Sequence, residues 1–165
     1  MKDMACELVG DIVLCLHNAK APDDGSWQVY VDACVASAGL HEGDFARTRQ
    51  LVWTDGGGPN APQRRAAVEA VENLKGAKEG RIAVVSSSTL VRGIVTVFNW
   101  FNFQVKAFSP GEIDMALSFL RVTPDEAARL WAAAERMAKL VNGGMPKAAI
   151  RPSVLGGSGL SAKKN

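Results

Sequence analysis

The sequence is poor in the residues that build metal centres and disulfide frameworks. Its 165 residues include two histidines and three cysteines, Cys6, Cys15 and Cys34, which form no Cys-x-x-Cys pair. A structural zinc site needs a cluster of Cys and His ligands, so this scarcity argues against one. An odd number of thiols without a framework spacing favours a reduced protein with buried cysteines, and we therefore expect a cytoplasmic location.

Long apolar runs are absent as well. No stretch approaches the roughly 18 to 20 apolar residues that a membrane-spanning helix needs. Near the start of the chain, Lys2, Asp3, Glu7 and Asp11 interrupt any apolar segment of a signal peptide. We therefore expect neither a transmembrane segment nor a secretory leader.

Charge of one sign is not in large excess, since 19 Lys and Arg residues stand against 17 Asp and Glu, a formal net charge of +2. Residues 142–165 hold four of the basic residues and no acidic one, so residues 1–141 carry 15 basic and 17 acidic residues, a net of −2. Four dispersed charges are too few for strong binding to a nucleic-acid backbone, so we expect no nucleic-acid partner. Weak contact of the basic tail with an acidic membrane surface stays open.

Nucleotide-binding and hydrolase motifs are also missing. The glycines 56–58 are followed by Pro59 and Asn60, which fits neither a phosphate-binding loop nor a dinucleotide fingerprint. The chain has no Gly-x-Ser-x-Gly motif, and neither His17 nor His41 has a Ser or Cys partner implied by the sequence. We therefore expect no enzymatic activity, no cofactor and no metal.

What the sequence does contain is an alternation of strand and helix patterns. Apolar runs predict strands at 5–9, 12–17, 50–54, 81–85 and 103–108, and helical spacing predicts helices at 27–39, 60–76, 89–101, 110–121 and 123–141. Single helices between strands imply right-handed crossovers and a mostly parallel sheet, which the opening hairpin makes mixed. The predicted fold class is α/β, in the order ββαβαβαβα with an extra C-terminal helix.

The same patterns divide the chain into three parts. We expect residues 1–122 to form one domain, residues 123–141 to add a helix that packs on it, and residues 142–165 to form a flexible tail rich in Gly, Ser and Lys. The helical periodicity ends at residue 142, so the tail is expected to contribute nothing to the core.

Polar residues gather where the predicted parallel strands end. The carboxyl ends of such strands meet at one edge of the sheet, where ligands bind in open α/β folds. Helix N-termini at this edge offer unpaired N–H groups, which suit an anion, although the same residues also serve to cap helices and turn corners. The residues expected there are Asp55, Gly57, Gly58, Asn60, Gln63, Arg64 and Arg92, with the hydroxyl groups of Thr54, Ser86, Ser87, Ser88 and Thr89.

The predicted third helix, 89–101, has little polar surface. Its second half contains Phe98, Trp100 and Phe101, and a helix that is apolar nearly all round is buried on several sides or meets a partner. Core packing, a homodimer or partner face, and a groove for a lipid or ligand are the alternatives.

The layout resembles a STAS domain, specifically the SpoIIAA-like branch of bacterial anti-anti-sigma factors. The resemblance covers residues 6–121. It rests on the opening hairpin, on strand 51–55 with a glycine and proline loop that leads directly into a helix, and on strands 82–85 and 105–108 before a terminal helix. More narrowly, Pro22-x4-Trp27 and Gly57-Gly-Pro-Asn60 with Gln63-Arg64 look like a group of uncharacterised bacterial STAS-like proteins.

The resemblance implies a non-enzymatic bacterial regulatory or adaptor module, which binds a regulator, kinase or scaffold through the loop and helix head after the third strand. Family members commonly carry a phosphorylated Ser or Thr at that helix head, where the phosphate releases the partner. Here the helix head at 60–63 contains no hydroxyl group, so the nearest candidate phosphoacceptors are Thr54 and the run 86–89. The alternative function is binding of a small ligand or an anionic lipid by the strand-end edge and the apolar third helix.

Overall fold

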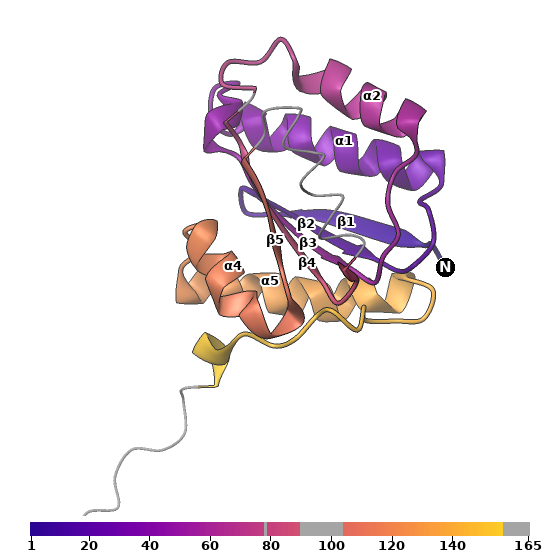
Figure 1. Cartoon of the computed structure of the whole chain (residues 1–165). Helices are drawn as coiled ribbons and strands as arrows, with labels where there is room; N and C mark the ends of the chain where they lie inside the picture. The colour runs from indigo at the N-terminus through magenta and orange to yellow at the C-terminus, as the bar shows by residue number, and fades with distance from the viewer. Residues whose placement is uncertain (78, 90–103, 157–165) are drawn as a thin grey trace, which may run out of the picture.

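The chain forms a five-stranded mixed sheet with helices on both faces (Figure 1). The structure is a computed structural model, and it describes residues 1–77, 79–89 and 104–156. The strands lie side by side in chain order: β1 (Met4–Val9), β2 (Ile12–His17), β3 (Arg49–Thr54), β4 (Arg81–Ser86) and β5 (Gln104–Phe108). The predicted α/β class is confirmed.

The sheet has one antiparallel pair and three parallel pairs. β1 and β2 form the predicted hairpin across Gly10, whose φ of 64° lies in the left-handed region that glycine adopts without strain. β2, β3, β4 and β5 then pair in parallel. β5, whose alternating sequence is typical of an edge strand, lies at one edge of the sheet, and β1 lies at the opposite edge.

Helices cover the two faces of the sheet (Figure 1). α1 (Asp24–Gly39) and α2 (Ala61–Val71) lie on one face, and α4 (Ile113–Phe119) and α5 (Pro124–Met137) lie on the other. Short 3₁₀ turns follow or precede them: η1 (Phe45–Arg47), η3 (Pro110–Glu112), η4 (Ala138–Leu140) and η5 (Ser153–Leu155). The apolar part of the predicted third helix, with Arg92, Phe98, Trp100 and Phe101, lies outside the described residues.

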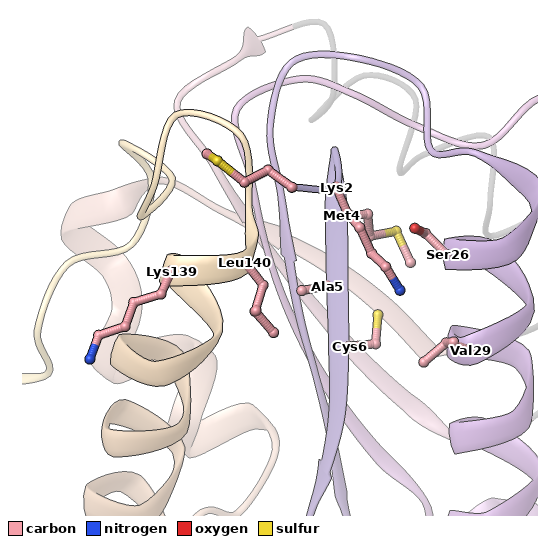
Figure 2. A pocket seen from close by; sticks show the side chains of 9 residues that line it. Lys2, Met4, Ala5, Cys6, Ser26, Val29, Lys139 and Leu140 are labelled. Atoms are coloured by element: carbon pink, nitrogen blue, oxygen red, sulfur yellow. The ribbon is translucent and has the colours of Figure 1, made fainter.

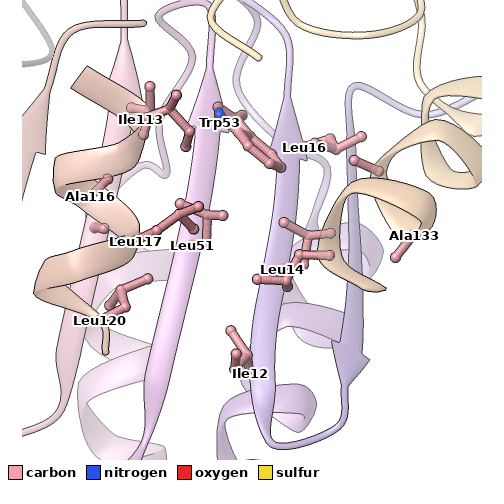
Figure 3. Packing of buried hydrophobic residues seen from close by; sticks show 14 of the residues in the cluster. Ile12, Leu14, Leu16, Leu51, Trp53, Ile113, Ala116, Leu117, Leu120 and Ala133 are labelled. Atoms are coloured by element: carbon pink, nitrogen blue, oxygen red, sulfur yellow. The ribbon is translucent and has the colours of Figure 1, made fainter. Parts of the chain in front are cut away.

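Each face of the sheet carries its own hydrophobic core. On the α4/α5 face, Leu14, Leu51 and Trp53 pack against the two helices (Figure 3), and Trp53 meets Trp131 of α5 edge to face. On the α1/α2 face, Val13 and other strand residues pack against α1, η1 and the end of α2. β2 is buried on both sides because its alternate residues belong to the two cores, and its almost continuous apolar run is typical of such a strand.

Residues 142–156 are part of the fold, which corrects the expectation of a flexible tail from residue 142. Ala148 is completely buried, and Met145, Ala149 and Leu155 pack against the core of the α4/α5 face. The packing of this segment could not be predicted from the sequence, because the residues that contact the core are separated by Gly, Pro and Ser and follow neither helical nor strand periodicity. Residues 157–165 lie outside the described residues.

The cysteines also differ from the expectation of three reduced thiols. Cys6 and Cys15 stand directly opposite each other on β1 and β2 and form a disulfide. Cys34 is free, and burial raises the pKa of its thiol to about 12.

A network of charges ties the far end of the sheet to α5. Nη2 of Arg49, at the start of β3, lies 2.8 Å from Oε1 of Glu126 and 2.6 Å from Oδ1 of Asp11. His41 lies beside the same Asp11, with 3.0 Å between Nε2 and Oδ2. The hydrogen bond from Arg49 holds the pKa of the Glu126 carboxyl at about 2, well below its ordinary value.

This ion pair predicts a pH-dependent contribution to stability. Since the folded-state pKa of Glu126 is depressed, the stabilisation is complete above the unfolded-state pKa of about 4.5 and disappears as the pH falls towards 2. Glu126→Gln keeps an acceptor for the N–H of Thr123 but loses the charge, so it should cost about 1–2 kcal/mol at pH 7. The difference from wild type should shrink below pH 4.5 and approach zero only below pH 2.

Urea denaturation across this pH range measures the difference. Glu69→Gln is the matched control, because Glu69 is exposed on α2, and it should leave the pH profile of the wild type unchanged. Parallel profiles for wild type and Glu126→Gln would contradict the assignment.

Candidate functional site

A row of buried polar residues marks the carboxyl ends of the parallel strands. Register places His17 beside Thr54 and Thr54 beside Ser86, and these residues are only 4%, 3% and 0% exposed. They lie on the α1/α2 face, since Gln50, four residues before Thr54, accepts a hydrogen bond from Tyr30 of α1. The predicted strand-end edge therefore exists, with a polar layer at its base.

Thr54 organises the glycine loop that follows it. Its Oγ1 accepts a hydrogen bond from the N–H of Gly56 at 3.1 Å and donates one to the carbonyl of Gly57 at 3.2 Å. The N–H of Gly57 in turn donates to the carbonyl of Asn18 at 3.0 Å. The loop is thus fastened to the segment that leaves β2.

Gly57 has no room for a side chain. A Cβ there would lie 2.6 Å from the carbonyl oxygen of Asn18 and 2.8 Å from Cε1 of His17, and closer still to the carbonyl oxygen of Lys20. Gly58, next along the chain, is exposed, and a Cβ there would meet nothing within 4 Å. The two glycines therefore serve different purposes, one as a tight contact and the other at the surface.

The head of α2 is fixed by a capping box between Asn60 and Gln63. Oδ1 of Asn60 accepts from the N–H of Gln63 at 2.9 Å, and Oε1 of Gln63 accepts from the N–H of Asn60 at 3.0 Å. The amide nitrogen of Gln63 also donates to the carbonyl of Pro22 and to Asp24. Gln63 is 5% exposed and joins α2 to the start of α1, so it is a structural residue rather than a contact for a partner.

Two other predicted site residues also have internal partners. Oδ1 of Asp55 accepts the backbone N–H of Ala148 at 3.2 Å, so residue 148 lies against this end of the strand. Arg64 donates from Nη1 to the carbonyl of Pro59 at 2.7 Å. The expected anion site relied on Arg64 and Arg92, of which the first makes this bond within the loop and the second lies outside the described residues.

The candidate phosphoacceptors fall into two groups. Thr54 and Ser86 are buried, and the Ser86 hydroxyl accepts the N–H of Ser88. Ser88 is half-buried, whereas Ser87 and Thr89 are exposed. Accessible hydroxyl groups of the set are therefore found after β4 and not beside the head of α2.

The sequence implies no Ser or Cys partner for His17, which favours a structural or solvated position for this residue. It is buried, its Nε2 has no hydrogen-bond partner among the described residues, and burial lowers the pKa of its imidazole. The continuous apolar run before His17 could have predicted its burial, because the last residue of a strand that is buried on both faces is itself buried. Across the described ranges, no group of three or more His, Cys, Asp or Glu residues could hold a metal ion.

The comparisons with known proteins identify no relative. No protein-family model, no curated protein and no solved structure matches the chain. Within the part of the chain that the structure describes, no helix has the length and apolar character to cross a membrane. The resemblance to STAS domains therefore stays a prediction from the sequence pattern.

Proposed function

We propose that this protein is a STAS-like regulatory or adaptor module of bacteria that binds a protein partner and performs no catalysis. The proposed contact, named here the docking surface, is the exposed part of the strand-end loop and the first turn of α2. It consists of Gly58, Asn60, Ala61, Pro62 and Arg65. The cytoplasmic location expected from the sequence rested on reduced thiols, and the Cys6–Cys15 disulfide removes that support, so location is not part of the proposal.

The observation that carries this proposal is the support beneath the docking surface. Gly57 is fastened to Asn18, and Gln63 closes the capping box while it joins α2 to α1. A surface that is already fixed loses little conformational freedom when a partner binds. Gly58, Ala61 and Pro62 also have few side-chain rotamers to order.

Phosphorylation at the helix head is not part of the proposal. The docking surface contains no Ser or Thr, and the neighbouring Thr54 is buried and occupied by Gly56 and Gly57. We expect the partner to bind without a phosphate switch at this position, so the protein acts as an adaptor whose occupancy follows the concentrations of the two proteins.

Replacement of Gly58 by arginine tests the docking surface. Open space surrounds this glycine and its φ is not positive, so the substitution should leave the fold intact while it places a long charged side chain in the interface. In affinity capture from a bacterial lysate with a C-terminal tag, we expect Gly58→Arg to lose a protein that wild type retains.

The matched control is Gly39→Arg, which adds the same side chain at an exposed glycine with open space at the end of α1. That end of α1 lies beside the β1–β2 turn, because Ser37 donates to the carbonyl of Asp11 there, at the opposite end of the sheet. Gly39→Arg should capture the wild-type set, with melting temperatures checked for all three proteins. The same captured set for Gly58→Arg and wild type would refute docking at this surface.

A further inference from the structure

A pocket of about 370 Å³ opens along the outer edge of β1 (Figure 2). Its floor is β1 from Met4 to Cys6. Val29 of α1 forms one wall and Leu140 of η4 forms the other, so the pocket lies where the edge of the sheet emerges between its two helical layers.

The backbone at this edge has hydrogen-bonding groups that face outwards. Cys6 and Cys15 are 4.4 Å apart between Cα atoms, the separation of an antiparallel pair that exchanges no backbone hydrogen bonds. The N–H and C=O groups of Cys6, and by alternation those of Met4 and Leu8, therefore point away from β2. Among the described residues, β1 pairs along its length with β2 alone.

One end of this edge already accepts an added segment of chain. The N–H of Lys2 donates to the carbonyl of Leu140, and the carbonyl of Lys2 accepts the N–H of Asn142, both at 2.8 Å. Lys2 has the same alternation as Met4 and Cys6, and it forms a parallel bridge with Val141. Among the described residues the pairing stops there, so none of their strands covers the edge where it continues into the pocket.

The walls and the charge of the pocket indicate what would occupy it. Val29 is 43% exposed and Leu140 is 58% exposed, so each side of the edge offers an apolar surface to alternate side chains. Lys2 and Lys139 also line the pocket, and within the described ranges neither forms an ion pair. The carboxylate of Glu7 on β1 is paired with Arg136.

These features favour a single extended segment over a second copy of the protein. Because α1 and η4 flank the edge, another folded copy would bring its own flanking elements against them. Lysine on an edge strand also disfavours pairing between identical edges, since it brings like charges together. A single extended acidic segment has no flanking helices to clash and brings the opposite charge to the lysines, so neither objection applies to it.

We propose that the outer edge of β1 binds an extended acidic segment of a partner protein by strand addition. The segment forms backbone hydrogen bonds with Met4, Cys6 and Leu8, places apolar side chains against Val29 and Leu140, and directs carboxylates to Lys2 and Lys139. Backbone pairing supplies general affinity in such sites, and the walls and charges select the sequence.

Synthetic peptides test this proposal directly. The probe is a fluorescent ten-residue peptide with a central pair of valines, whose side chains point to opposite faces of a strand, flanked on both sides by glutamates. It is titrated by anisotropy with the whole protein tagged at its C-terminus, because Met1 lines the pocket. We expect saturable binding at least tenfold tighter than that of the counterpart with lysine in place of glutamate. Lys139→Glu should weaken the binding by about fivefold.

Two N-methylated forms of the peptide distinguish strand addition from simple charge attraction. In an added strand, alternate N–H groups face β1 and solvent. Methylation of either the odd-numbered or the even-numbered residues should therefore abolish binding in one form and spare it in the other. The matched control protein is Lys106→Glu, the same change at an exposed lysine on the opposite edge strand β5, which should alter affinity less than twofold.

Three outcomes would overturn the proposal. The acidic peptide could bind no tighter than the basic one, or both methylated peptides could bind as well as the parent. Alternatively, sedimentation could reveal a dimer that Lys139→Glu strengthens, which would assign the edge to a second copy. None of these readouts depends on the docking surface, so Gly58→Arg should bind the acidic peptide like wild type.

Discussion

Gly57→Ala is expected to lower the free energy of unfolding by about 3 kcal/mol, which corresponds to a fall in melting temperature of roughly 10 °C. The added methyl group would lie within 2.6 Å of the carbonyl oxygen of Asn18 and 2.8 Å of Cε1 of His17. Two of the three nearest atoms belong to the backbone, so a side-chain rotation cannot relieve the clash. The loop must move, and the hydrogen bond from Gly57 to Asn18 is lost with it.

Gly58→Ala provides the control one residue away. Its methyl group would meet nothing within 4 Å and its φ is not positive, so the change should stay within about 0.5 kcal/mol of wild type or stabilise slightly. Thermal and urea unfolding of the two variants measure the difference. Equal stabilities would show that the contact between the glycine loop and residues 17–20 is not held in solution.

The order and direction of the strands could be predicted because each rests on a local pattern. β2 is a continuous apolar run that is buried on both faces, and β5 alternates because one of its faces is more open. The heads of α2 and α5 carry Asn60 with Gln63 and Thr123 with Glu126, a spacing that predicts a capping box, and both boxes form.

The disulfide could have been predicted from the sequence. A hairpin with a two-residue turn at Gly10 and Asp11 pairs Val9 with Ile12, and counting back from that pair places Cys6 opposite Cys15. The expectation of reduced thiols came from the absence of a Cys-x-x-Cys spacing and left this register out. The disulfide therefore follows from a local stretch of sequence, but only when the residues of the two predicted strands are paired one by one.

The finer arrangement of the strand-end edge could not be predicted, because it depends on contacts between distant segments. Gln63 is engaged by Pro22 and Asp24, and Asp55 by Ala148, across about 40 and 90 residues of chain. A sequence pattern identifies such residues as polar and close to a loop. It does not say whether their hydrogen-bonding groups face a partner or the protein itself.

Removal of residues 143–165 is expected to lower the free energy of unfolding by about 3 kcal/mol, although composition alone suggests an expendable tail. The truncation uncovers the place of Ala148 in the core and removes the packing of Met145, Ala149 and Leu155. It also removes the backbone N–H of Ala148, from which Asp55 accepts a hydrogen bond. Asn142 remains, so its hydrogen bond to Lys2 beside the β1 edge is kept.

Three further proteins make this test more specific. A chain that ends at Gly156 keeps all of these contacts and should unfold within about 0.5 kcal/mol of wild type. Ala148→Glu in the full chain would bury a carboxylate, so the segment should detach instead, and the loss should approach that of the truncation without exceeding it. Lys147→Glu, at an exposed neighbouring position, should have little effect. A melting temperature unchanged by removal of 143–165 would contradict the packing of this segment and would support the prediction of a flexible tail.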